Sequence, residues 1–118
     1  MTKYRHLELL SSGPVTRVRL VDQLPAYHQK EIEELAAEWN SVAETADCRT
    51  LVMDCSNVKV LSSEMLSKLI LLQRQLKQKQ GNLILSGIRA EVREVLSWTK
   101  LGKFFEIEDA EPEAVTLA

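Results

Sequence analysis

Glycine and proline are scarce in this chain of 118 residues, which contains four glycines and three prolines. Their combined share is about half of the roughly 12% found in average proteins. With so few backbone breakers, the sequence predicts long regular elements joined by short connections. The glycines are isolated from one another, at positions 13, 81, 87 and 102. This spacing excludes the glycine-rich loops that bind nucleotide phosphates.

An excess of positive charge is also missing, because 15 lysines and arginines face 17 acidic residues and the net charge is −2. Proteins that bind nucleic acid phosphates normally carry a clear basic excess, so we expect no nucleic acid partner. No apolar run approaches the ~18 residues that span a bilayer. Residues 1–6 also lack the apolar stretch of a secretory signal. We therefore expect a cytoplasmic protein without membrane insertion.

Residues that commonly carry catalysis or bind metals are few. Cys48 and Cys55 are too few for a disulfide framework or a structural zinc site, and we expect buried or incidental thiols. His6 and His28 have no Cys, Asp or Glu partner at ligand spacing, so we expect both on the surface. The sequence thus predicts a binding module that is not an enzyme and that uses no cofactor and no metal.

Two segments of alternating hydrophobicity, at residues 4–10 and 15–21, surround a turn signal at residues 11–14. The alternation places Leu7 and Leu9 on one side of the first segment. Two such segments around a four-residue turn predict an antiparallel hairpin.

From about Ala26 the apolar period changes to three and four residues, which is typical of an amphipathic helix. The predicted helix has about five turns, and its other face is filled by lysines and glutamates. Its apolar positions are Ile32, Leu35, Ala36, Trp39, Val42, Ala43 and Ala46.

Strands and helices alternate along the rest of the chain. Residues 51–53 form an apolar run that is typical of a strand buried on both faces, and residues 82–85 form another. Helices are predicted over residues 63–79 and 91–98. Residues 104–107 predict a last edge strand or a docked segment.

Local signals mark the ends of these elements. Ser62 or Ser63 can cap the helix over 63–79, because a side-chain oxygen there accepts a hydrogen bond from a backbone N–H that has no partner in the helix. Gly81 is expected to end that helix. Asp54, at the end of the first apolar run, is expected to cap the loop that follows it.

The predicted order is therefore β-β-α-β-α-β-α, followed by the last segment. Strands that alternate with helices are parallel with right-handed crossovers, and their partners bind beyond the carboxyl ends of the strands. Here that edge holds the loop over 54–63 and the Ser86–Gly87 turn. We expect one domain over residues 1–107 and an acidic tail over residues 108–118.

The stretch over residues 51–63, LVMDCSNVKVLSS, places an apolar strand before Asp54, then a short loop and a serine pair that opens a helix. It resembles the centre of the STAS domain of the bacterial anti-sigma factor antagonist family, in which an Asp-Ser-Ser-Gly-like motif opens the same helix. The resemblance continues through residues 80–87, 91–96 and 101–107. It implies a STAS-like α/β fold, in which a mixed sheet contains an N-terminal antiparallel hairpin and then parallel strands in β-α units, with amphipathic helices packed on it.

The resemblance also implies a regulatory protein that switches partners. In this family the unphosphorylated domain binds an anti-sigma factor that is also a serine kinase. The kinase phosphorylates the second serine of the motif, and a phosphatase restores the first state. The matching residue here is Ser63, with Ser62 as the second choice. The partner-binding residues that the resemblance implies are Asp54, Ser56, Asn57, Ser62, Ser63, Glu64 and Ser86.

Other interpretations stay open at this stage. Leu61 and Glu64 occupy the positions of the Asp and the Gly that flank the serine pair in the family, which favours a non-switching STAS scaffold or a transport-accessory subunit. N-capping alone would explain Ser62 and Ser63. In another class of protein, Asp54 would accept a phosphoryl group, as in response-regulator receivers, or the same edge would bind a nucleotide. The sequence also leaves room for a homo-oligomer.

Overall fold

Five strands and three helices make up the described part of the chain. The computed structural model describes residues 4–21, 29–58, 62–98 and 105–108. In chain order, its elements are β1 (Leu7–Ser11), β2 (Val15–Leu20), α1 (Gln29–Ala43), β3 (Thr50–Asp54), α2 (Ser63–Gln78), β4 (Asn82–Ser86), α3 (Ala90–Trp98) and β5 (Glu106–Glu108). The predicted order is confirmed, including an edge strand at residues 106–108.

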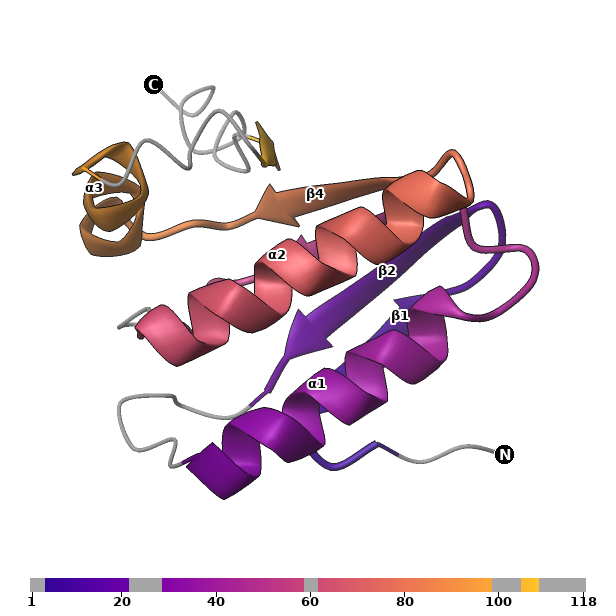
Figure 1. Ribbon diagram of the computed structural model, residues 1–118, viewed down its shortest axis with the longest axis horizontal. Helices are drawn as coiled ribbons and strands as arrows, with labels where there is room; N and C mark the ends of the chain where they lie inside the picture. The colour runs from indigo at the N-terminus through magenta and orange to yellow at the C-terminus, as the bar shows by residue number, and fades with distance from the viewer. Residues whose placement is uncertain (1–3, 22–28, 59–61, 99–104, 109–118) are drawn as a thin grey trace.

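The strands form one mixed sheet with the spatial order β1-β2-β3-β4-β5. β1 and β2 are antiparallel, whereas β2, β3, β4 and β5 run parallel to their neighbours. Each crossover moves one strand further in the same direction, so right-handed crossovers place the helices on the same face of the sheet. Figure 1 shows α1 and α2 side by side in front of the strands. The predicted mixed sheet is confirmed.

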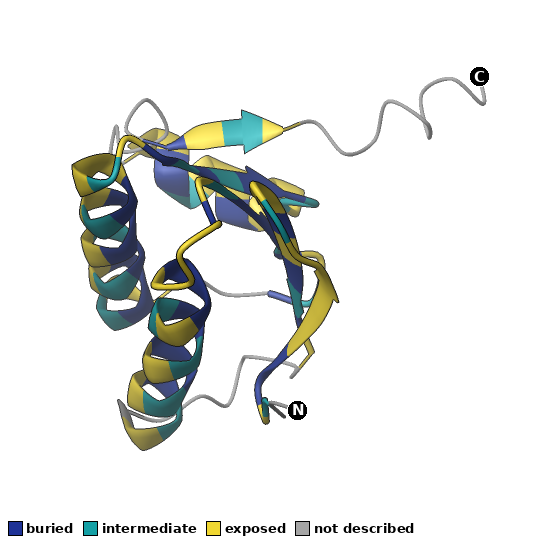
Figure 2. Cartoon of the chain, turned by 90° about the vertical axis from the view of Figure 1, so that its right-hand side faces the viewer, coloured by how far each residue is buried: buried dark blue, intermediate teal, exposed yellow. Residues whose placement is uncertain are grey.

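The core lies between the sheet and the helices. Leu51 and Met53 of β3 are fully buried, as are Trp39 of α1 and Leu72 of α2. Figure 2 shows the buried sides of α1 and α2 turned toward the sheet. Val52 is only 4% exposed but lies outside this core cluster, because alternate side chains of a strand point to opposite faces. The prediction that this strand is buried on both faces is confirmed.

The described part of α1 ends earlier than the sequence predicts. The periodicity reaches Ala46, but α1 ends at Ala43 and Ala46 is exposed. The Nζ of Lys79 donates to the carbonyl oxygens of Ala43 and Thr45, at 2.8 and 2.9 Å. The lysine thus bonds the carbonyl of the last residue of α1, which has no partner in the helix, and one carbonyl of the turn that follows. The predicted start at Ala26 lies outside the described residues.

His6 is buried, so the prediction that it lies on the surface is wrong. It is 6% exposed, and its Nε2 lies 3.0 Å from Oε1 of Glu34 in α1. Its backbone N–H donates to Oε1 of Glu38 at 2.9 Å. The hydrogen bond with His6 holds the pKa of the Glu34 carboxyl below its usual value. These contacts attach the start of β1 to α1. The same prediction for His28 falls outside the described residues.

Leu9 lies on the same side of β1 as Leu7, as expected, but only Leu7 is buried. The register pairs Leu7 with Leu20 and Leu9 with Val18, which are both core residues of β2. Leu7 is 3% exposed, whereas Leu9 is 44% exposed. The register shift that indicates a bulge comes after Leu9, between Leu9 and Ser11. Periodicity therefore gives the side of this edge strand on which a residue lies, but not how far that residue is covered.

The glycine after α2 has a different role from the predicted one. α2 ends at Gln78, and the residue with a left-handed backbone is Gln80, with φ of 63°, and not Gly81. The N–H of Gly81 donates to the carbonyl of Leu76 at 2.7 Å. A Cβ at Gly81 would lie 2.2 Å from the carbonyl oxygen of Arg49. Glycine is therefore needed here because two backbones approach closely.

Cys48 and Cys55 are both free and buried, as predicted. Glu106 and Glu108 of β5 are exposed, and residues 109–118 of the predicted acidic tail lie outside the described residues. Within the described ranges, no helix has the length and apolar character needed to cross a membrane.

Candidate functional site

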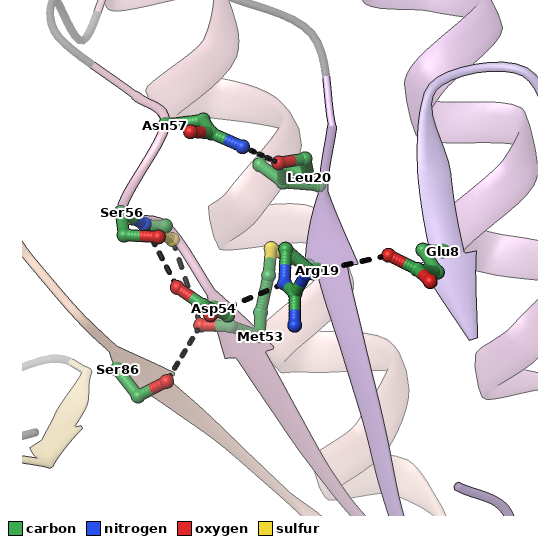
Figure 3. A network of polar contacts seen from close by, with 9 residues as sticks. Glu8, Arg19, Leu20, Met53, Asp54, Ser56, Asn57 and Ser86 are labelled. Carbon is green, nitrogen blue, oxygen red and sulfur yellow. Dashed lines mark hydrogen bonds and ion pairs between the residues drawn. The ribbon is translucent and has the colours of Figure 1, made fainter. Parts of the chain in front are cut away.

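Asp54 stands at the carboxyl end of β3 and organises the loop that follows. Its Oδ1 accepts a hydrogen bond from the backbone N–H of Ser56 at 2.9 Å, which confirms the predicted loop cap. Its Oδ2 lies 3.6 Å from Nε of Arg19 in β2. The Nη1 of Arg19 lies 3.5 Å from Oε1 of Glu8 in β1. Figure 3 shows these polar contacts crossing from β1 to β3.

Ser86, at the end of β4, holds the other side of the loop. It is 8% exposed, and its hydroxyl donates to the carbonyl oxygen of Met53 at 3.4 Å. Its own carbonyl accepts from the N–H of Cys55 at 2.8 Å. Burial, with a contribution from the charge of Asp54, raises the pKa of the Cys55 thiol to about 12. That thiol stays protonated near neutral pH, so it is a packing group and not a nucleophile.

Asn57 also binds the loop to the sheet. Its Nδ2 donates to the carbonyl oxygen of Leu20, at the end of β2, at 2.8 Å. The side chain is half-buried. The described geometry therefore gives Asn57 a positioning role for the loop.

The turn between β4 and α3 contributes two residues that the sequence does not single out for this role. The Nε of Arg89 donates to the carbonyl oxygen of Ser56 at 2.8 Å. Gly87 has a φ of +66°, and a Cβ there would lie 2.8 Å from Oδ1 of Asp54. Arg19 of β2, which lies near Asp54, is a third site residue that the sequence does not single out for this role. Gly87 lies in a predicted turn, but no local signal identifies Arg19 or Arg89, because their partners are distant in the sequence.

Ser62 and Ser63 have different roles. Ser62 is the N-cap of α2, and its hydroxyl oxygen accepts from the N–H of Met65 at 3.1 Å. Ser63 is the first helical residue and is exposed. Glu64 lies beside it in the first turn and is half-buried. Of the two open choices, capping therefore belongs to Ser62, and the hydroxyl of Ser63 is not used for it.

The structure brings together most of the predicted residues at one edge of the sheet. Asp54 and Ser86 are neighbours in the register of β3 and β4, and Ser56 contacts Asp54 directly. Ser63 follows on α2, after residues 59–61, which lie outside the described residues. This arrangement offers a loop segment at Ser56 and Asn57 that polar contacts hold in place, and an exposed hydroxyl at the start of α2. Both features suit recognition of another protein.

The two serines should respond differently to substitution. We expect Ser62→Ala to lower the free energy of unfolding by about 1 kcal/mol, because the N–H of Met65 loses its partner. Ser63→Ala should change it by less than ~0.5 kcal/mol, as for other exposed positions. Urea denaturation of both variants and the wild type measures the difference. Equal losses in the two variants would contradict the assigned roles.

Comparisons with known proteins agree with this fold. The sequence matches the STAS domain family over residues 6–114. An anti-sigma factor antagonist (STAS) domain protein from Planctomyces limnophilus has a TM-score of 0.77 at 19% identity, over 94% of this chain and 96% of that one. The anti-sigma factor antagonist SpoIIAA in its unphosphorylated form has a TM-score of 0.67 at 19% identity, over 93% of this chain and 94% of that one. The Bacillus cell fate determinant SpoIIAA in its phosphorylated form has a TM-score of 0.64 at 16% identity, over 95% of this chain and 99% of that one.

Proposed function

The chain belongs to the STAS domain family, and we propose that it is a cytoplasmic anti-sigma factor antagonist controlled by phosphorylation of Ser63. In this proposal it binds an anti-sigma factor that is also a serine kinase, and a phosphatase reverses the modification. It is a regulatory binding protein and not an enzyme. The likeness in fold to anti-sigma factor antagonists, SpoIIAA among them, supports the proposal.

The exposed position of Ser63 is the observation that carries the proposal. Because Ser62 provides the N-cap, a phosphoryl group on Ser63 would leave the capping hydrogen bond in place. The phosphoryl group would carry a charge of about −1.5 to −2 at neutral pH. The positive end of the helix dipole favours negative charge at this position. Phosphorylation would therefore change the surface of the protein without unfolding α2.

The loop beside Ser63 supplies the rest of the proposed partner surface. Ser56 is exposed, while its backbone N–H is held by Asp54 and its carbonyl by Arg89. A segment held on both sides loses little conformational entropy when it binds a partner.

Two other functions would use the same residues. A non-switching scaffold would use the same loop but would not be phosphorylated. Glu64 favours the scaffold, because this residue puts a fixed negative charge beside Ser63. A receiver would use Asp54 as the phosphoryl acceptor. Both carboxylate oxygens of Asp54 are engaged, by the N–H of Ser56 and by Arg19. This favours a structural role for Asp54.

Incubation with a candidate anti-sigma factor kinase and Mg-ATP tests the proposal. Mass spectrometry should find one added phosphoryl group on Ser63 in the wild type and in Ser62→Ala, and none in Ser63→Ala. Gel filtration of the unmodified chain with the kinase should show a complex that phosphorylation dissociates. A stable complex without modification would favour the scaffold. Modification of Asp54 by acetyl phosphate would favour the receiver.

A further inference from the structure

The sheet face opposite the helices has a regular order of side chains. The register of the parallel strands defines two rows on it that extend across all four of these strands. Reading from β2 to β5, the first row is Arg17, Val52, Ile84 and Glu106, and the second is Arg19, Asp54, Ser86 and Glu108. Val52 and Ile84 lie outside the core cluster formed with the helices, as expected for side chains on this second face.

Charge on this face, called here the open face, changes sign across the sheet. β2 contributes Arg17 and Arg19, whereas β5 contributes Glu106 and Glu108. Arg17 and both glutamates are exposed. Val52 and Ile84 separate the charges in the first row and are respectively buried and half-buried. The first row is therefore positive at β2, apolar at β3 and β4 and negative at β5, which makes it complementary to itself after a half-turn. In the second row, Arg19 also lies near Glu8 and Asp54 of its own chain.

We propose that the open face binds a second copy of this chain. The two sheets would stack with a two-fold axis parallel to the strands, between β3 and β4. This rotation places β2 of each copy over β5 of the other. Arg17 then faces Glu106 of the partner copy, and the Val52–Ile84 pair covers its own counterpart. In the second row, Arg19 faces Glu108 of the partner copy.

The charges select this axis over the alternative. An axis through β3 would place β1 over β5 and bring Glu8 opposite Glu108 of the partner copy. It would also leave Arg17 facing the apolar Ile84. Like charges that face each other disfavour association, whereas the axis between β3 and β4 pairs opposite charges in both rows.

The size of the open face predicts a weak dimer. Four strands lie about 4.8 Å apart, and at 3.3 Å per residue the contact covers about five residues of β2, β3 and β4 and three of β5, which gives a flat area of roughly 300 Å² per copy. Stable complexes bury about 800 Å² per partner. We therefore expect a reversible dimer with a dissociation constant on the order of 0.1 mM, weakened by salt because the charge pairs lie at its rim.

Sedimentation equilibrium with a charge swap tests the dimer. Arg17→Glu should weaken self-association at least tenfold, because it places two negative side chains together at both symmetric positions. Glu106→Arg should do the same. The double variant Arg17→Glu/Glu106→Arg should return close to wild type. Arg74→Glu is the matched control, since it makes the same charge change at an exposed position on α2 and should have no effect.

Three results would overturn the inference. The wild type could stay monomeric at millimolar concentration and low salt. Arg17→Glu could leave a dimer unchanged, which would place the interface elsewhere. The double variant could fail to recover although both single variants dissociate and keep the wild-type circular dichroism spectrum, which would rule out this pairing. These measurements use the chain alone, so they are independent of the proposed partner switch.

Discussion

Gly81→Ala should lower the free energy of unfolding by about 3 kcal/mol, the largest loss expected from removing or adding one methyl group in this fold. The added Cβ would lie 2.2 Å from the carbonyl oxygen of Arg49 and 3.1 Å from that of Leu76. Neither oxygen can move freely. Arg49 accepts from the N–H of Asn82 at 2.8 Å, and Leu76 accepts from Gly81 itself at 2.7 Å.

Substitution of the preceding residue, Gln80, is a control in which the free energy of unfolding should not fall. Gln80 has a φ of 63°, a conformation that glycine adopts without strain. Gln80→Gly should therefore be neutral or stabilise the fold by up to about 1 kcal/mol. Urea denaturation of both variants measures the contrast. A Gly81→Ala variant within about 1 kcal/mol of the wild type would show that β3 and β4 can separate at this point without cost.

The same junction shows how far the sequence predicts this structure. Periodicity identifies α2 and β4, because it reflects which side chains face the core. It does not identify which residue after α2 takes the left-handed backbone. Gly81 was the natural expectation from local chemistry, but its neighbour Arg49 comes from a distant turn. The close approach of these two backbones is a tertiary contact, and a local pattern carries no information about it.

The candidate site also combines roles that follow from local sequence with contacts that do not. Asp54 and Ser62 act on N–H groups two and three residues ahead, so their capping roles follow from local sequence. Arg89 binds the carbonyl of Ser56, 33 residues away, and Arg19 of β2 lies 3.6 Å from Asp54 of β3. Such partners become neighbours only when the sheet order and the helix packing are known. Local sequence therefore predicts the residues that are positioned, but not the residues that position them.

Ser63→Asp should weaken binding to the anti-sigma factor by about 100-fold, or ~2.7 kcal/mol. The added carboxylate imitates part of the charge of a phosphoryl group and joins that of Glu64 at the start of α2. The fold should keep its stability within ~0.5 kcal/mol, because an acidic residue suits the helix N-terminus. Ser63→Ala should bind as tightly as the wild type. Calorimetric titration against the anti-sigma factor measures all three affinities.

Ser67→Asp is the matched control for this effect. Ser67 is exposed on the same helix one turn further along, and its hydroxyl donates to the carbonyl of Ser63. It receives the same charge, so a general repulsion between the proteins would weaken binding in both variants. A loss confined to Ser63→Asp would locate the contact at the first residue of α2. Equal affinities for Ser63→Asp, Ser63→Ala and the wild type would contradict control through Ser63. The exposed serine would then have no part in recognition, and the scaffold function would account better for Glu64.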